Sequence, residues 1–128
     1  MINNSARKFQ KDLNSGVLAL VLLATLARSD EDLYGYEIAK RLRESRNERD
    51  GADASFAEGS LYPVLRSLSA AGWLTSRIVP SYSGPPRRYY RVTPAGREAL
   101  AEWLRRWQHT RDFVEVCTAG IPARILEA

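Results

Sequence analysis

The chain has 128 residues, of which 45% are hydrophobic and 27% charged, and its formal net charge is +4. This length and composition predict one small globular domain, and the modest positive charge favours a polyanionic partner without deciding for one. A single cysteine excludes an internal disulfide, and no secretory leader pattern opens the sequence, so we expect a cytoplasmic protein.

The first element is predicted in two parts. Residues 5–13 are polar and basic, with two apolar residues one turn apart, which indicates a short amphipathic arm. Asn14 or Ser15 can then cap a helix over residues 17–27, whose Val, Leu and Ala content predicts a helix enclosed by other elements. This apolar stretch is shorter than the ~20 residues that cross a bilayer, so no membrane span is expected.

A second helix is predicted over residues 33–45, where apolar residues recur at helical spacing. Its inward stripe consists of Tyr36, Ile38, Ala39 and Leu42. The charged stretch 46–57 lacks a helical period and predicts a loop, in which residues 55–57 could add a short edge strand.

The third helix is predicted from Gly59 to Ala71. Its buried stripe consists of Leu61, Leu65 and Leu68. Pro63 is compatible with this helix because we expect it in the first turn, where its missing N–H removes no helical hydrogen bond. Gly72 is a natural residue to end the helix.

From Trp73 the apolar period changes to two, which predicts a β-hairpin. We expect its second strand over residues 87–92 and a seven-residue tip, PSYSGPP, over residues 80–86. Three helices followed by a hairpin are typical of a winged helix-turn-helix. The predicted fold class is therefore mainly α (α+β), with this domain extended by a long C-terminal helix.

That last helix is predicted over residues 94–120, because Thr93 can cap it and Pro94 suits its first position. Trp103 and Trp107 lie one turn apart, and we expect them to exceed what one small domain can bury, which predicts a homodimer. The two tryptophans could also line a pocket between the subunits, since flat aromatic walls suit planar ligands. The candidate dimer and effector residues are Leu100, Trp103, Leu104, Trp107 and Val114.

The predicted organisation is an arm and winged helix-turn-helix over residues 1–93, a dimerisation helix over 94–120 and a tail over 121–128. The candidate DNA-binding residues are Tyr34, Tyr36, Lys40, Ser60, Tyr62, Arg66, Arg87 and Arg88. Arg66, on the third helix, is the best candidate to contact a base or a phosphate, and Arg87 and Arg88 at the hairpin tip suit phosphates or the minor groove. Tyr36 suits core packing as well as it suits a phosphate. A two-fold dimer would bind a pseudo-palindromic site with half-sites about 10 bp apart or a multiple of that.

Catalytic and cofactor motifs are missing from the sequence. His109 is the only histidine and Cys117 the only cysteine, so one chain cannot assemble a His/Cys metal cluster. No phosphate-binding glycine loop and no G-x-S-x-G motif occurs, and a Cys117 nucleophile would lack an orienting acid. We therefore expect no cofactor, no metal and no enzymatic activity.

Four segments carry a resemblance to a known family: LYGYEI (33–38), GSLYPVL (59–65), GWL (72–74) and GPPRRYYRVTPAG (84–96). With the apolar first helix, these motifs cover residues 17–107 and resemble the PadR family of bacterial transcriptional regulators, in particular its small members with one C-terminal dimerisation helix. The resemblance implies a winged-helix homodimer that represses a promoter and releases DNA when a small effector binds. It also implies that Trp107 occupies the place where relatives hold planar aromatic compounds.

Two functions therefore remain open from the sequence. The first is a repressor whose effector changes the spacing of its two recognition helices. The alternative is a protein-interaction module that uses the winged fold and the tryptophan-bearing helix, with little specific affinity for DNA.

Overall fold

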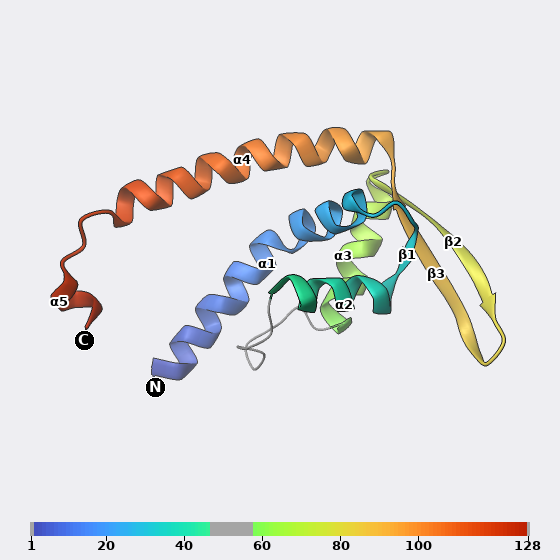
Figure 1. Cartoon of the computed structure of the whole chain (residues 1–128), viewed down its shortest axis with the longest axis horizontal. Helices are drawn as coiled ribbons and strands as arrows, with labels where there is room; N and C mark the ends of the chain where they lie inside the picture. The colour runs from blue at the N-terminus through green and yellow to red at the C-terminus, as the bar shows by residue number, and fades with distance from the viewer. Residues whose placement is uncertain (1, 47–57, 128) are drawn as a thin grey trace.

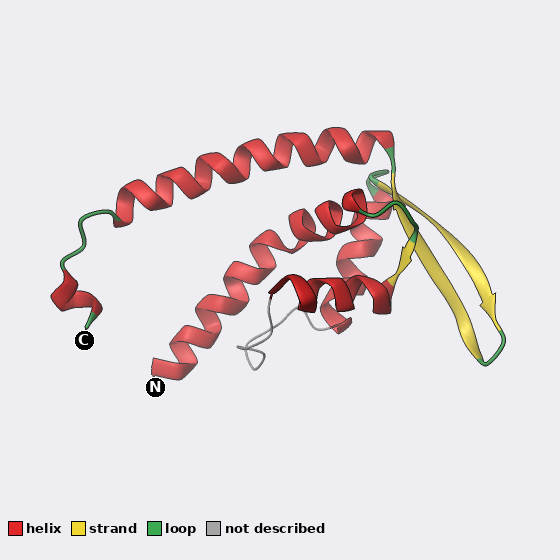
Figure 2. Ribbon diagram, in the orientation of Figure 1, coloured by secondary structure: helices red, strands yellow, loops and turns green. Residues whose placement is uncertain are grey.

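The computed structural model describes residues 2–46 and 58–127, which form a helical body, a projecting hairpin and a long C-terminal helix (Figure 1). The helices are α1 (Ile2–Arg28), α2 (Gly35–Arg46), α3 (Glu58–Ala70), α4 (Pro94–Thr118) and α5 (Ala123–Leu126). The strands are β1 (Leu33–Tyr34), β2 (Leu74–Ser81) and β3 (Gly84–Val92), and Figure 2 shows them on one side of the helices. The predicted edge strand at residues 55–57 lies outside the described residues.

Helix α1 is continuous, so the prediction of a separate arm followed by a cap at Asn14 or Ser15 was wrong. The helix has 27 residues and passes through both positions. Inside it, the Asn14 side chain accepts a hydrogen bond from Gln10 one turn earlier, at 2.8 Å. Asn and Ser cost a helix interior less than about 1 kcal/mol each relative to Ala. The packed C-terminal half of α1 is therefore enough to extend the helix through them.

The core lies where the second half of α1 meets α2, α3 and the base of the sheet. Helix α1 contributes four buried leucines, and α3 contributes the predicted stripe. The fully buried large side chains are Leu22, Leu23, Leu33, Ile38, Leu61 and Leu65. Burying each of them stabilises the fold by about 1.5–3 kcal/mol. The predicted inward stripe of α2 is confirmed except at Tyr36, whose side chain is 50% exposed.

The sheet has three antiparallel strands in the order β1-β3-β2. Residues 33 and 34 do not begin the second helix, as was predicted, but form β1, where Leu33 pairs with Tyr90 and Tyr34 with Tyr89. The alternation predicted for β3 is confirmed, because Tyr90 and Val92 are buried. Strand β3 is therefore central, and β1 joins the hairpin to the start of α2.

The hairpin turn is shorter than predicted. Ser81 pairs with Gly84, so only Tyr82 and Ser83 lie between the strands, and a bulge interrupts the pairing beside Pro80. Pro85 and Pro86 of β3 form the bulge opposite Pro80 of β2, where no residues are paired, so their missing N–H groups cost no sheet hydrogen bond. All the predicted tip prolines are thus inside strands. As a result, Arg87 and Arg88 lie along β3 rather than at the tip.

Helix α3 has the predicted bounds to within one residue at each end, but Pro63 is not where it was predicted to be. Gly72 has φ +84°, its N–H donates to the Ser69 carbonyl, and the Trp73 N–H donates to the Leu68 carbonyl, both at 3.0 Å. This double hydrogen bond is the Schellman ending of a helix. Pro63 lies inside the helix and not in its first turn. The helix tolerates it because the buried Leu61 and Leu65 on either side anchor this segment to the core.

Helix α4 begins at the predicted cap. The Thr93 hydroxyl accepts a hydrogen bond from the Gly96 N–H at 3.0 Å, and Pro94 occupies the first turn. The same hydroxyl donates to the Gly72 carbonyl at 2.7 Å. The helix then runs for 25 residues and extends beyond the body on the side away from the hairpin (Figure 1).

Candidate nucleic-acid interface

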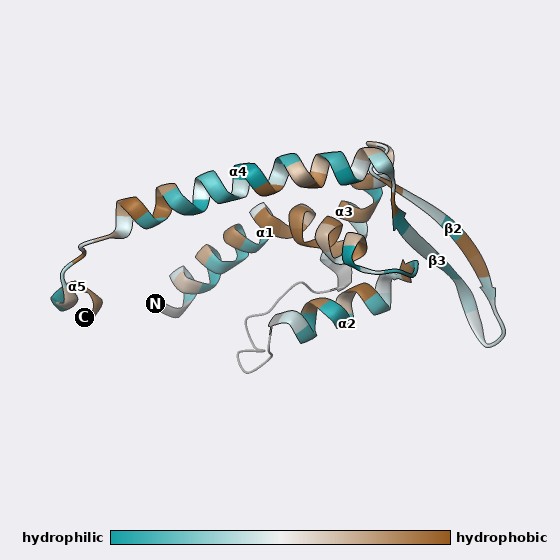
Figure 3. Ribbon diagram, turned by 45° about the horizontal axis from the view of Figure 1, so that its top comes forward, coloured by the Kyte–Doolittle hydropathy of each residue, from teal (hydrophilic) through white to brown (hydrophobic). Residues whose placement is uncertain are grey.

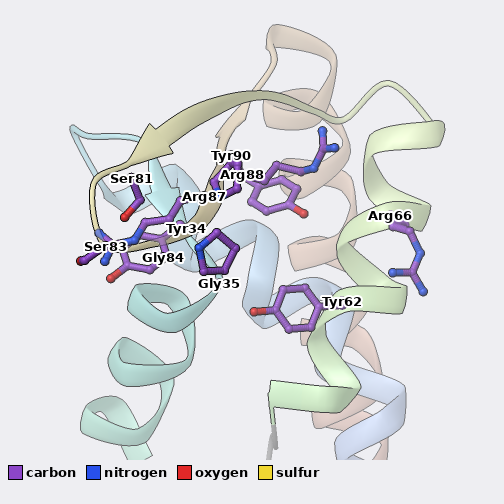
Figure 4. Close-up of a pocket in the computed structure, with 12 residues that line it drawn as sticks. Tyr34, Gly35, Tyr62, Arg66, Ser81, Ser83, Gly84, Arg87, Arg88 and Tyr90 are labelled. Carbon is purple, nitrogen blue, oxygen red and sulfur yellow. The ribbon is translucent and has the colours of Figure 1, made fainter.

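A cleft of about 540 Å³ separates α3 from the hairpin, with β1 and the first residue of α2 at its base (Figure 4). Its lining is made of arginine, tyrosine and small residues: Tyr34, Gly35, Tyr62, Arg66, Ser81, Ser83, Gly84, Pro85, Pro86, Arg87, Arg88 and Tyr90. None of these lining residues is acidic. The cleft is therefore a positively charged slot between a helix and a strand.

The three arginines of the cleft come from two elements, α3 and β3. Arg66 projects from the outer side of α3, while Arg87 and Arg88 come from β3 (Figure 4). The Arg87 guanidinium carbon lies 4.6 Å from the centre of the Tyr34 ring, and Arg88 Nη1 donates to Ser76 Oγ at 3.1 Å. All these arginine side chains are exposed. Stacking and hydrogen bonding order two cations without neutralising them, which leaves their charge available to a phosphate.

Tyr62 of α3 faces the first residue of α2 across the cleft (Figure 4). A Cβ atom on Gly35 would lie 2.5 Å from the Tyr62 hydroxyl oxygen, so glycine is needed for the ring to take this position. Burial raises the pKa of Tyr90 above its ordinary value, and its neutral ring forms part of the cleft wall. The Tyr62 ring of α3 thus packs directly against the start of α2.

The other predicted DNA-binding residues surround the cleft. Tyr36 stacks on Tyr34, with ring centroids 6.3 Å apart, and is half exposed. Lys40 and Ser60 are exposed on α2 and α3. The structure therefore brings Tyr34, Tyr62, Arg66, Arg87 and Arg88 into one cleft and leaves the remaining residues beside it.

Sequence reasoning missed an ion-pair cluster behind the cleft. Asp32 Oδ1 accepts from Arg91 Nε at 2.6 Å, and Asp32 Oδ2 accepts from Arg77 Nε at 3.0 Å. The hydrogen bond from Arg91 is the main cause that lowers the pKa of Asp32 below its ordinary value. These partners lie 45 and 59 residues from Asp32 along the chain, so no local pattern could have revealed them.

The predicted dimer and effector residues divide into two groups. Leu100 and Trp103 are partly buried against the core, and the Trp103 ring meets the edge of Trp73 at 4.8 Å between centroids. The prediction that one domain cannot bury both tryptophans is therefore wrong for Trp103, which packs against Trp73 of the same chain. The exposed group is Leu104, Trp107 and Val114.

Further exposed apolar side chains occur beyond that group, on the half of the molecule away from the hairpin (Figure 3). On α4 and after it they are Phe113, Val116, Ile121, Ile125 and Leu126, and on α1 they are Phe9 and Leu13. Val116 is 75% exposed and Phe113 67%. We call these residues, together with Leu104, Trp107 and Val114, the apolar end of the molecule, because so much exposed apolar surface is typical of a region that binds a partner.

Two other features are absent from the described residues. No group of three His, Cys, Asp or Glu side chains there could hold a metal ion. None of the helices in residues 2–46 and 58–127 is long and apolar enough to cross a membrane.

Comparison with known proteins gives a consistent result. Residues 22–102 match the profile of the Transcriptional regulator PadR-like family. The structure resembles that of a PadR family transcriptional regulator from Eggerthella lenta, with a TM-score of 0.78 and 27% identity over 94% of this chain and 97% of that chain. The expected winged-helix fold with a long C-terminal helix is thereby confirmed.

Two further relatives bear on function. Bacillus subtilis PadR, solved in complex with operator DNA, matches with a TM-score of 0.58 and 26% identity over 69% of this chain and 46% of that chain. Transcriptional regulator Rv3488 of Mycobacterium tuberculosis is 54% identical over 46 residues, which are 34% of this chain and 40% of that protein.

Proposed function

Because this chain belongs to the PadR-like family of transcriptional regulators, we propose that it is a sequence-specific repressor that binds operator DNA as a homodimer and releases it when a small molecule binds near α4. The observation that carries the proposal is the cleft between α3 and the hairpin, which is lined by arginines and contains no acidic residue. A regulator of this kind needs no catalytic group, and we propose no enzymatic activity.

The proposed DNA contacts follow from the exposure of the residues around the cleft. Helix α3 enters the major groove with Ser60, Tyr62 and Arg66, because the opposite side of this helix is occupied by its buried leucines. Arg87 and Arg88 bind phosphates along the hairpin, and Tyr34, Tyr36 and Lys40 hold the backbone beside α2. Phosphate contacts set the register of the protein, and Arg66 is the residue proposed to contact a base.

The proposed partner of the apolar end of the molecule is a second copy of the chain. The exposed apolar residues of α4, α5 and α1 are on the side of the molecule away from the hairpin, so two copies that pair there keep both clefts free (Figure 1). A two-fold dimer would offer two α3 helices to successive major grooves. In this proposal residues 1–93 bind DNA, residues 94–120 form the dimer and residues 121–128 extend it.

The proposed effector binds beside Trp107. This ring is 37% exposed, whereas Trp103 is packed against Trp73, so Trp107 is the better candidate to stack on a planar aromatic compound. A compound bound between two α4 helices would favour one crossing angle of the dimer over another. Release of DNA then follows from the changed distance between the two α3 helices.

The test is fluorescence anisotropy with a labelled duplex taken from upstream of the protein's own gene and a scrambled duplex of the same composition. The proposal expects about a thousandfold preference for the upstream duplex, with affinity that falls as salt rises. Equal, weak binding to both duplexes by a protein that still forms oligomers would contradict it. That result would favour the alternative, a protein-interaction module.

A further inference from the structure

Asp32 is an acidic side chain with almost no solvent access, in a region that is otherwise rich in exposed arginine. It lies in the turn between α1 and β1, and its side chain is 8% exposed. Each of its carboxylate oxygens forms an ion pair with a different arginine, one with Arg91 and the other with Arg77. A carboxylate held in this way by two cations has one well-defined orientation.

These two arginines belong to different strands of the hairpin. Arg77 is on β2 and Arg91 on β3, near the base of the hairpin, and both are well exposed apart from their contact with Asp32. The turn that carries Asp32 continues into β1 and then α2. The Tyr34 N–H at that junction donates to Glu37 Oε1 at 3.1 Å, which fixes the start of α2. One carboxylate therefore connects both strands of the hairpin to the segment from which α2 begins.

A row of side chains extends this connection to the cleft. The Arg77 guanidinium carbon lies 5.1 Å from the Tyr89 ring centre, and the Tyr89 ring lies 5.3 Å from that of Tyr34. The Arg87 guanidinium in turn lies over the Tyr34 ring. The order along the row is Asp32, Arg77, Tyr89, Tyr34, Arg87. A change in the hairpin angle at Asp32 would move the cation at the other end.

We propose that Asp32 is a positioning residue for DNA binding, which holds the hairpin at the angle that α3 and Arg87 need to contact one operator together. This inference rests on the proposed function and adds to it a residue that does not itself touch DNA. A charge effect and a positioning effect of Asp32 change the affinity for DNA in opposite directions. Removing a negative charge strengthens binding to DNA if charge alone matters, whereas loss of the hairpin angle weakens binding to the specific site.

The decisive variant is Asp32→Asn, with Glu102→Gln as its matched control. Glu102 also binds two arginines, Arg105 and Arg106, but all three residues lie on α4. The control therefore makes the same change of charge and frees two arginines without disconnecting any elements. Both variants are titrated by anisotropy on the upstream and scrambled duplexes, and amide hydrogen exchange is measured on the free proteins.

The expected result is about a tenfold loss of affinity for the upstream duplex in Asp32→Asn, the effect of one lost contact. Affinity for the scrambled duplex is expected to stay equal or to rise, and exchange is expected to accelerate in β2 and β3 but not in α3. Specific affinity that is unchanged or higher, or an equal loss in Glu102→Gln, would overturn the proposal. If the wild-type protein shows no preference between the two duplexes, the proposed function fails. The role of Asp32 is judged separately from hydrogen exchange: unchanged exchange in the hairpin of Asp32→Asn overturns that role.

Arg77→Gln repeats the test if Asp32→Asn does not fold, because it leaves the pair between Asp32 and Arg91 intact. A positioning role predicts weaker specific binding with the same dependence on salt. Because the proposed dimer has two copies of Arg77, a fall of about 1.8 in the salt slope would show that Arg77 itself contacts phosphates, and would overturn its proposed positioning role.

Discussion

Replacement of Arg87 by Gln removes the cation that is stacked on Tyr34 at the edge of the cleft. The side chain is exposed and makes no ion pair among those found in the described residues, so its loss should change stability by less than about 1 kcal/mol. The proposed phosphate contact, in contrast, depends on the charge. This variant therefore separates a role in DNA binding from a role in the fold.

The magnitude follows from the release of counterions. One phosphate contact contributes about 0.9 to the slope of log affinity against log salt concentration, and a dimer would lose two such contacts, or about 1.8. Over a fourfold rise in salt, the wild-type protein should lose about tenfold more affinity than the variant. Because phosphates carry no sequence information, affinity for the upstream and scrambled duplexes should fall by similar factors.

Anisotropy titrations at about 50 and 200 mM salt measure both slopes. Arg124→Gln is the matched control, because Arg124 is exposed on α5 at the opposite end of the molecule from the hairpin (Figure 1). A salt slope that is the same in Arg87→Gln and wild type, or an equal decrease in the control, would refute the assignment of Arg87 to a phosphate.

Four further predictions test other parts of the molecule. Arg66→Ala should weaken binding to the upstream duplex by about 1–3 kcal/mol and leave the scrambled duplex nearly unaffected; equal effects on both would exclude a base contact. Gly96→Ala should lower the free energy of unfolding, measured by urea denaturation, by about 1–3 kcal/mol, because the new Cβ atom would collide with the Trp73 carbonyl oxygen. Gly16→Ala, whose Cβ atom would lie in open space, should raise the same free energy by about 0.5–1 kcal/mol. Trp107→Ala should raise the dimer dissociation constant at least about tenfold in sedimentation equilibrium, and an unaltered dimer would restrict Trp107 to its own protomer. Because the pKa of Asp32 is lowered by folding, its ion pairs stabilise the fold at pH values above its ordinary pKa of 3.8. This stabilisation is lost as the pH falls through the folded pKa. Asp32→Asn should therefore lose less thermal stability than wild type between about pH 7 and about pH 3.

The elements predicted most accurately from the sequence are those fixed by local chemistry. Helix α3 was predicted within one residue at each end, and α4 within two at its C-terminus, since Gly72 and the Thr93-Pro94 pair act on neighbouring backbone groups. The prolines of the hairpin were misleading. They have the composition of a loop, but strand pairing across Ser81 and Gly84 places them at a bulge.

The features that could not be predicted depend on contacts between distant segments. Strand β1 has two residues, and its only reason to be a strand is β3, more than fifty residues later. Asp32 likewise has distant partners, Arg77 and Arg91, and its sequence context predicts an ordinary polar turn. In the candidate site, the sequence could only suggest the residues proposed to bind DNA, because the cleft that unites five of them depends on the position of the hairpin.

The joint between the hairpin and α4 decides how an effector could act on DNA binding. Thr93 is bonded to Gly72 at the end of α3 and to Trp73 at the start of the hairpin, through its hydroxyl and its N–H. Gly96 packs so closely on Trp73 that no larger residue fits. Helix α4 is thus fixed at its first turn to the end of α3 and to the base of the hairpin. In the proposed dimer, a change in the crossing angle of the two α4 helices would rotate each winged domain as a rigid unit. This movement would alter the distance between the two α3 helices without distorting either cleft.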